Sequence, residues 1–462
     1  MPRQARLGGS QTGGKSFSWF MLLELLSVGG FLLFLGIGNT RLALVLLVGP
    51  FQIMAWTVAL RGSSYALALF AALLPAAGLE LLPIPYARYV YLPVAIVLLI
   101  IVTRDFLADG ASIRRRRLTW PDTIPLVLLG LSLVLSTTSA VVHGWTRSEL
   151  WHQVVLFAEA MALLYFFAVA PTTVTDVRAV ILTFCLTLSA TILVSWFIPG
   201  VSGSDAILGG ITSKGGLNVL GAFLSCGTAL LLGIFLQTDR TSSRIVVLLC
   251  MVVVLSTLVL TRSRGAWLGF GVAVLYALLR VRSGWLWTVL VFAALLLLGV
   301  GPLRDVLLSR ASETSEGDPS FLGRLFLWSY AWKIFKANWL LGVGFDNFRY
   351  VKHFYGYPGQ LWWIVRFHAH NIFLEMLVDL GVVGFTAFCW LYLRTLFRLD
   401  RIVRARTPDR WALALGLGAA LVAYAAHGLF DYVAFQYGAL ALLCVLLGLG
   451  INVSGRSPST VG

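Results

Sequence analysis

The chain has 462 residues, of which 59% are hydrophobic and 12% charged, and it carries a formal net charge of +15. Many stretches near twenty residues long hold almost no charge, which is typical of a polytopic membrane protein and excludes a soluble multidomain enzyme. The positive charge does not indicate nucleic-acid binding. The arginines gather in short connections, as at Arg114 to Arg117, where the positive-inside rule places them.

Helices are the expected elements, because each backbone amide in hydrocarbon must be satisfied within its own segment and the apolar runs do not alternate as barrel strands do. We predict an all-α polytopic membrane protein with about 12–14 transmembrane helices. In chain order the predicted spans are 18–38, 41–60, 64–82, 87–103, 123–142, 151–170, 176–198, 215–237, 245–261, 265–279, 285–301, 372–394, 411–427 and 430–450. The five cysteines all fall within apolar segments and are expected to be buried thiols.

Charge predicts the orientation of these spans. With the N-terminus in the cytoplasm, the most arginine-rich connections fall inside, and the C-terminus lies inside as well. The predicted organisation is an N-terminal set of transmembrane helices, a second set with an arginine turn at the outer face, one long external loop, and a C-terminal set of helices. These four parts cover residues 1–200, 201–301, 302–371 and 372–462.

The external loop is too long and too basic to be a simple connector. Within it, the stretch "GRLFLWSYAWKIFKANW" places Leu325, Trp328, Trp332 and Phe335 at helical spacing, with Arg324 and other cations between them. This pattern predicts an amphipathic helix in the outer headgroup layer. The alternative is a helix that rests on the membrane without any part in chemistry.

The most unusual polar stretch follows that loop. "RFHAHNIFLEMLVDLGVVG" places His368, His370 and Asn371 at the start of an apolar helix that also carries Glu375 and Asp379. A helix N-terminus attracts anions through its free N–H groups. On a helical wheel the two acids lie away from His370, so neither is expected to orient it. The alternative is an interfacial histidine pair beside a structural buried acid.

Two further polar groups precede spans at the same predicted face. In "TRSRGAWLGF", Arg262 and Arg264 lie in a tight reversal, where two arginines can hold a phosphate bidentately. In "GGITSKGGLNVLG", Lys214 and Asn218 stand at the start of another span. The alternative for the arginines is snorkelling at a helix end.

The last polar group is "HGLFDYVAF", in which His427 and Asp431 are four residues apart near the outer end of the final hairpin. Two ligands alone make a poor metal site. The sequence also lacks a phosphate-binding G-x-x-x-x-G-K-[ST] loop and any D-x-D or D-x-x-D pair. Neutralisation of an external phosphate is therefore expected to depend on arginine and lysine, with no metal and no cofactor.

One motif resembles a known family. "HNIFLEMLVDLGVVG" fits the pattern H-N-x9-G-x-x-G through His370, Asn371, Gly381 and Gly384. It is similar to the signature of the O-antigen ligase and O-antigen polymerase superfamily, whose members are multi-span glycosyltransferases with a GT-C-type helical bundle. The resemblance covers about residues 200 to 450.

Three shorter stretches add to this resemblance. "RGAWL" is similar to the ligases' R-x3-L motif through Arg264 and Leu268, "LLGVGFDNF" to a Gly-rich stretch ahead of the histidine, and "HGLFDY" to the closing His and Asp. The chain departs from the pattern near Asn218, where Lys214 stands in place of the usual arginine. Lysine offers a point charge instead of a planar fork.

The resemblance implies transfer of a glycan from undecaprenyl diphosphate to an acceptor at the periplasmic face of the bacterial inner membrane, without a metal. His370 would be the base that activates the acceptor, and Arg264 would bind the donor diphosphate, with Arg262, Lys214 and Arg324 as further cations. The supporting residues would be His368, Asn371, Asn218, His427 and Asp431.

Three functions stay open on the sequence alone. An O-antigen ligase would use the lipid A–core of lipopolysaccharide as acceptor, and a polymerase would use a second carrier-linked glycan. A transporter for an anion or a lipid-linked sugar would instead show an internal repeat and polar groups near the bilayer midplane. The single long external loop favours the ligase.

Overall fold

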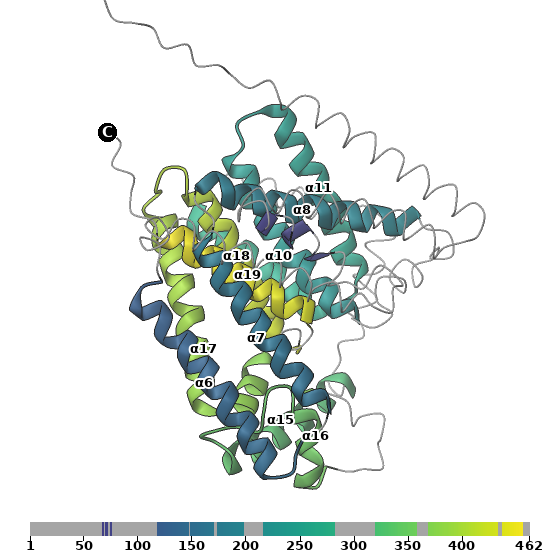
Figure 1. The fold of residues 1–462 in the computed structure, drawn as a ribbon. Coiled ribbons are helices and arrows are strands. Elements are labelled where there is room, and N and C mark those ends of the chain that lie inside the picture. Colours follow the sequence, from purple (N-terminus) through teal and green to yellow (C-terminus); the bar gives the residue numbers. More distant parts are fainter. Residues whose placement is uncertain are drawn as a thin grey trace, which may run out of the picture.

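The computed structural model describes residues 67, 68, 70–72, 74, 75, 118–146, 148–170, 173–197, 216–281, 319–357, 368–432 and 437–455. All regular structure in these residues is helical (Figure 1). Eight of the helices in this part of the chain are long and apolar enough to cross a membrane. The predicted class, an all-α polytopic membrane protein, is confirmed.

The helices follow the predicted spans closely. Their bounds are α6 Trp120–Val142, α7 Ser148–Val169, α8 Val174–Phe197, α10 Gly216–Gln237, α11 Thr241–Leu260, α12 Arg264–Val281, α15 Pro319–Ala337, α16 Phe348–Val351, the 3₁₀ turn η1 Lys352–Tyr355, α17 Ile372–Arg404, α18 Trp411–Gly428 and α19 Tyr437–Ser454. The largest difference is that α17 continues beyond 394 to Arg404. Residues 430–432, predicted to begin the last span, are not helical, and the other bounds differ by four residues or fewer. The spans predicted at 18–38, 41–60, 87–103 and 285–301 lie outside the described residues.

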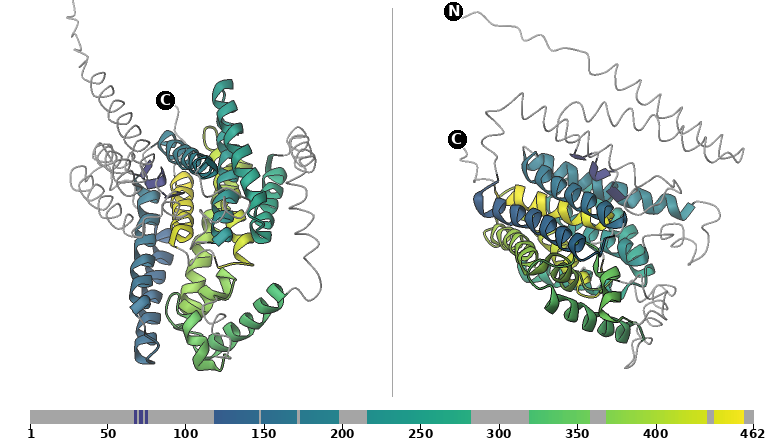
Figure 2. Two further views of the ribbon diagram at one scale, coloured as in Figure 1. Left: turned by 90° about the vertical axis from the view of Figure 1, so that its right-hand side faces the viewer. Right: turned by 60° about the horizontal axis from the view of Figure 1, so that its bottom comes forward.

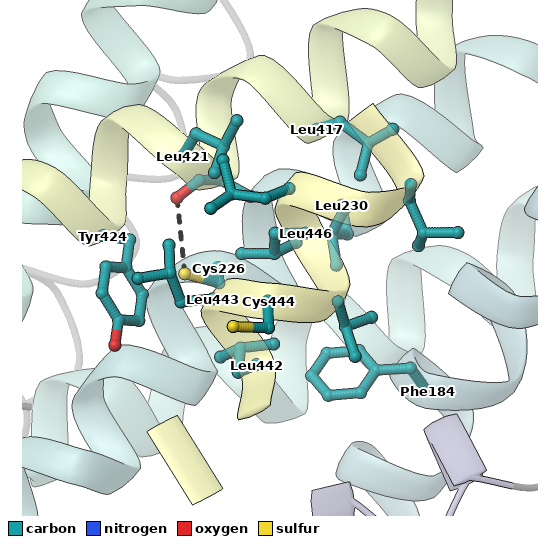
Figure 3. Close-up of a cluster of buried hydrophobic side chains, with 14 of the residues drawn as sticks. Phe184, Cys226, Leu230, Leu417, Leu421, Tyr424, Leu442, Leu443, Cys444 and Leu446 are labelled. Carbon is teal, nitrogen blue, oxygen red and sulfur yellow. Dashed lines mark hydrogen bonds between the residues drawn. The ribbon is translucent and has the colours of Figure 1, made fainter. Parts of the chain in front are cut away.

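The core of the bundle lies between α10 and α18, against which α19 also packs (Figure 3). Small residues allow the first two helices to approach closely: a Cβ on Gly233 would lie 2.7 Å from the carbonyl oxygen of Ala412. The Cys226 thiol donates to the carbonyl of Ala420 at 3.4 Å. All five cysteines are free thiols, of which four are buried and Cys389 is half-buried. The core is therefore a close-packed apolar interior, as membrane helix association requires.

Ion pairs join the helices at one end of the bundle. Asp122 at the start of α6 accepts hydrogen bonds from Arg394 at 2.9 Å and Arg398 at 2.8 Å, both on α17. Farther along α17, Asp400 pairs with Arg280 at the end of α12. These arginines belong to the connections that the positive-inside rule predicts on the inner side.

At the opposite end, α15, α16 and η1 form a cap beside the start of α17 (bottom of Figure 1; Figure 2). The helix predicted in the loop is present as α15, and a second set of its residues packs on the rest of the protein. Leu327, Ala331 and Ile334 are buried, whereas Leu325 and Trp332 are 42% and 51% exposed. The three buried residues form the face through which α15 packs against α17 and η1.

A break inside α17 fixes this cap to the bundle. At Gly381 the backbone leaves helical geometry, with φ 67° and ψ −176°. The carbonyls of Val378 and Asp379 accept hydrogen bonds from the N–H groups of Val343 and Gly344, at 3.1 and 3.0 Å. The N–H of Val382 in turn donates to the carbonyl of Trp339 at 2.8 Å. The Gly-rich segment 339–344 therefore docks on α17 through backbone hydrogen bonds.

We expect Gly381→Ala to destabilise the protein. The conformation at Gly381 is one that essentially only glycine adopts, which costs another residue about 1–3 kcal/mol, and the added Cβ would overlap the carbonyl of Leu340. Gly271→Ala is the matched control, because a Cβ there meets nothing within 4 Å. Thermal unfolding in detergent should show a lower midpoint for Gly381→Ala only; equal midpoints would contradict the docking role.

Candidate active site

His370 directly precedes Asn371, the N-cap residue of α17. Asn371 caps the helix, since its Oδ1 accepts from the backbone N–H groups of Phe373 and Leu374 at 3.0 Å each. His370 itself has a positive φ of 51°. A non-glycine residue in this region is uncommon and concentrates at functional sites. The cap therefore holds a strained His370 at a defined point on the helix end.

The partner of His370 is Asp431, which lies 61 residues farther along the chain. Nδ1 of His370 is 3.3 Å from Oδ1 of Asp431. The side chain of His370 is 18% exposed, whereas that of Asp431 is 4% exposed. Burial raises the pKa of Asp431, but the hydrogen bond and charge of His370 outweigh burial, so this pKa lies below its ordinary value. Asp431 is therefore an ionised carboxylate placed against an imidazole.

His427 comes from the same predicted motif but is placed differently from expectation. Helix α18 ends at Gly428, so His427 and Asp431 do not lie one turn apart on a helix. His427 is fully buried, and neither of its ring nitrogens has a hydrogen-bond partner among the described residues. It packs against the start of α12, where a Cβ on Gly265 would lie 2.7 Å from its Cδ2. Arg324 of α15 is close enough to His427 for their charges to interact.

The arginine turn lies between α11 and α12, beside His427. Arg262 is exposed, with φ 52°, and Arg264, the first residue of α12, is half-buried. The turn is tied to the start of α10, because the Ser263 hydroxyl donates to Oδ1 of Asn218 at 2.7 Å. Lys214 lies outside the described residues. Three polar groups that the sequence presented separately thus meet at one end of the bundle.

Asp379, the buried acid in α17, has a structural role. One of its oxygens accepts from the N–H of Asp346 at 2.8 Å, and the other accepts from the N–H of Phe348 at 3.0 Å. The sequence indicates that this carboxylate needs a partner at its depth. The partners are backbone amides of the docked segment, so Asp379 strengthens the attachment of that segment to α17.

A buried ionic cluster lies next to this attachment. It comprises Asp346, Arg349, Lys352, His368 and Glu375. His368 pairs with Glu375 through Nδ1, which is also 3.4 Å from Oδ1 of Asp346. Arg349 donates to the other oxygen of Asp346 at 2.6 Å. Lys352 is fully buried and lies close enough to Glu375 for their charges to interact.

The cluster contains a group with metal-ligand chemistry. Ligand atoms of Asp346, His368 and Glu375 all lie within 4.8 Å of one another. Cations, however, already lie beside these carboxylates: Arg349 donates to Asp346, and Lys352 lies near Glu375. Burial raises the pKa of Asp346 to about 6, and the charges of His368 and Arg349 offset this only in part. Burial also lowers the pKa of Lys352 to about 8. We therefore describe the group as an internal ion-pair network.

The arrangement has the chemistry of a positioned base beside an anion site. A carboxylate that accepts from one ring nitrogen of an imidazole fixes its tautomer and stabilises the imidazolium form, which is the arrangement that base chemistry uses. The sequence did not indicate that His370 pairs with Asp431. It also did not indicate that Asp346 lies beside His368, or that Tyr432 packs against His370. The family-like motif "HGLFDY" was the one signal that pointed to Asp431.

Comparison with known proteins agrees with the resemblance. Residues 249–389 match the family model described as O-antigen ligase. A predicted polysaccharide ligase of Rickettsia felis is 30% identical over 88 residues, which are 18% of this chain and 22% of that protein. Counterparts in Rickettsia conorii and Rickettsia typhi are 27% and 30% identical over 88 residues, covering 18% of this chain and 21% and 22% of theirs. The matched stretch thus spans about a fifth of these relatives. Residues 249–389 of this polytopic membrane protein are therefore similar to the O-antigen ligase family.

Proposed function

We propose that the protein is a glycosyltransferase that moves an O-antigen glycan from undecaprenyl diphosphate to the lipid A–core of lipopolysaccharide. The transfer takes place at the periplasmic face of the bacterial inner membrane and needs no metal. The proposal rests on the ligase-like match and on one observation above all: His370, at the head of α17, is paired with the buried carboxylate of Asp431.

The pair would supply the base. Nε2 of His370 takes the proton of the acceptor hydroxyl as its oxygen attacks the anomeric carbon of the donor sugar. A new glycosidic bond forms, the bond from that carbon to the diphosphate oxygen breaks, and its electron pair leaves with the diphosphate. Asp431 keeps the imidazole oriented and stabilises its charged form, as the third member of a catalytic triad does.

Arginines would hold the donor. The diphosphate gains charge as it leaves, so cations placed around it lower the barrier without any proton transfer to it. Arg264 stands at the start of α12, next to His427, and Arg324 approaches His427 from α15. Arg262 and Lys214 are further candidates. The prenyl tail would lie in lipid while the diphosphate stays at headgroup depth.

The acceptor decides between a ligase and a polymerase. Purified protein in lipid nanodiscs would receive carrier-linked glycan together with either lipid A–core or a second carrier-linked glycan. Transfer to lipid A–core with release of undecaprenyl diphosphate supports the proposal, whereas chain extension on the carrier would make the protein a polymerase. Movement of intact donor across a bilayer without product would indicate the transporter.

The proposed topology places both termini in the cytoplasm.

His370→Ala should abolish most of the transfer. Removal of a general base typically slows a reaction about 10²- to 10⁴-fold. His143→Ala is the matched control, because His143 is an exposed histidine near the outer end of α6. Turnover is measured at saturating donor and acceptor. If His370→Ala kept half of the wild-type turnover, the base would be another residue.

Arg264 should govern donor affinity. A charge-assisted hydrogen bond contributes about 1.5–3 kcal/mol, so we expect Arg264→Ala to weaken donor binding roughly ten- to a hundredfold. Arg264→Lys keeps the charge without the fork and should retain part of the affinity. His370→Ala should leave it unchanged, and Lys336→Ala controls for loss of a cation from α15. Equilibrium binding of undecaprenyl diphosphate tests this prediction. Unchanged affinity in Arg264→Ala would mean that Arg264 does not bind the donor and is an arginine that snorkels at a helix end.

Chelators should leave transfer intact. The carboxylates of the buried cluster already have Arg349, Lys352 and His368 beside them, so a divalent ion would have to compete with these cations. We expect full activity in excess EDTA and substoichiometric metal in the purified protein by elemental analysis. Inactivation by EDTA that magnesium or manganese restores would assign the Asp346, His368 and Glu375 group to a metal.

A further inference from the structure

Tyr432 connects the buried ionic cluster to the His370–Asp431 pair. On one side its ring stacks on His368, with centroids 4.1 Å apart and planes 12° from parallel. On the other side the same ring meets His370 edge to face, at 5.1 Å and 81°. One aromatic ring thus lies between the two histidines of the motif.

Tyr432 also contacts the carboxylate that orients His370. Its backbone N–H donates to Oδ1 of Asp431 at 2.8 Å, and this is the oxygen that faces Nδ1 of His370. A shift of Tyr432 would therefore move the carboxylate and release one face of the imidazole together. Both members of the pair depend on where this tyrosine lies.

His368 is the fixed end of this contact. It is 6% exposed, and its Nδ1 is engaged by Glu375 of α17 and lies 3.4 Å from Asp346. Glu375 also accepts from the N–H of Ala369, at 3.0 Å, through its second oxygen. A ring so held cannot turn toward an acceptor to serve as a base. Tyr432 stacks on one face of this ring.

We propose that His368 is a positioning residue, which acts through Tyr432 to hold the His370–Asp431 pair in the geometry for proton transfer. This inference rests on the proposed function, because it assigns His370 as the base. It gives the two histidines different roles: His370 touches the acceptor, and His368 fixes the orientation of His370. Misplacement of a reacting group by about 1 Å can cost about a hundredfold in rate.

The test is a double-mutant cycle on turnover. His368→Gln and Tyr432→Leu should each lower kcat about ten- to a hundredfold while undecaprenyl diphosphate binds as tightly as to wild type. If His368 acts through Tyr432, the double variant should be no slower than the slower single variant, because interacting residues do not have additive effects. Tyr432→Phe keeps the stacking ring and should retain kcat.

His353→Gln is the matched control. It makes the same substitution at the same end of the molecule, in a histidine that packs against Tyr357 instead of Tyr432, and we expect wild-type kcat. Additive losses in the double variant, or a loss in Tyr432→Phe equal to that in Tyr432→Leu, would overturn the positioning role. If His368→Gln fails to fold, the comparison of Tyr432→Leu with Tyr432→Phe decides alone.

The same assay separates this inference from the proposed function. His370→Ala is measured beside the other variants. Full activity in His370→Ala would refute the proposed base, and with it the positioning of that base. Loss in His370→Ala together with wild-type kcat in Tyr432→Leu would leave the proposed function standing and refute the role of His368.

Discussion

The backbone hydrogen bonds between α17 and the segment 339–344 are the constraint on which the rest of the site depends. A helix that crosses lipid cannot leave its amides unpaired. At Gly381 the helical bonds are interrupted, and the carbonyls of Val378 and Asp379 are satisfied by the docked segment instead. Helix and segment are therefore expected to fold as one unit. Because Asp346 follows the docked segment directly, the position of the ionic cluster is set by this exchange.

The ionic cluster fixes the orientation of its side chains more than it stabilises the fold. Desolvation of buried ion pairs roughly cancels their attraction, whereas removal of one partner leaves an uncompensated charge that costs about 3–5 kcal/mol. His368 is consequently confined to one orientation between Asp346 and Glu375. The ring of Tyr432 stacks on His368 and is therefore restricted in position as well. This is how a residue without access to substrate gains influence over His370.

The helices were predictable from the sequence, because the length and polarity of a membrane span are set by the bilayer itself. The prediction was wrong where tertiary contacts decide. Residues 430–432 were expected to be helical, yet Asp431 lies outside the helix and faces His370. The packing of α15 on the rest of the protein through Leu327, Ala331 and Ile334 was not part of the prediction.

The candidate site was predictable as a set of residues but not as a set of pairs. His370, Asn371 and Asp431 could be named from their motifs, and Asn371 proved to be the helix cap. The pairing of His370 with Asp431 could not be predicted, because no periodicity relates residues 61 positions apart. Gly381 was part of the recognised motif, but the need for glycine there is explained only by the close approach of the segment 339–344.

The two ends of the bundle have different roles. At one end, α17 is fixed by Arg394 and Arg398 to Asp122. At the other end, the same helix carries His370 on its capped terminus and meets a carboxylate from the segment after α18. Under the proposed function, the donor diphosphate and the base would meet at the start of α17, because deeper in a bilayer both would lose solvation.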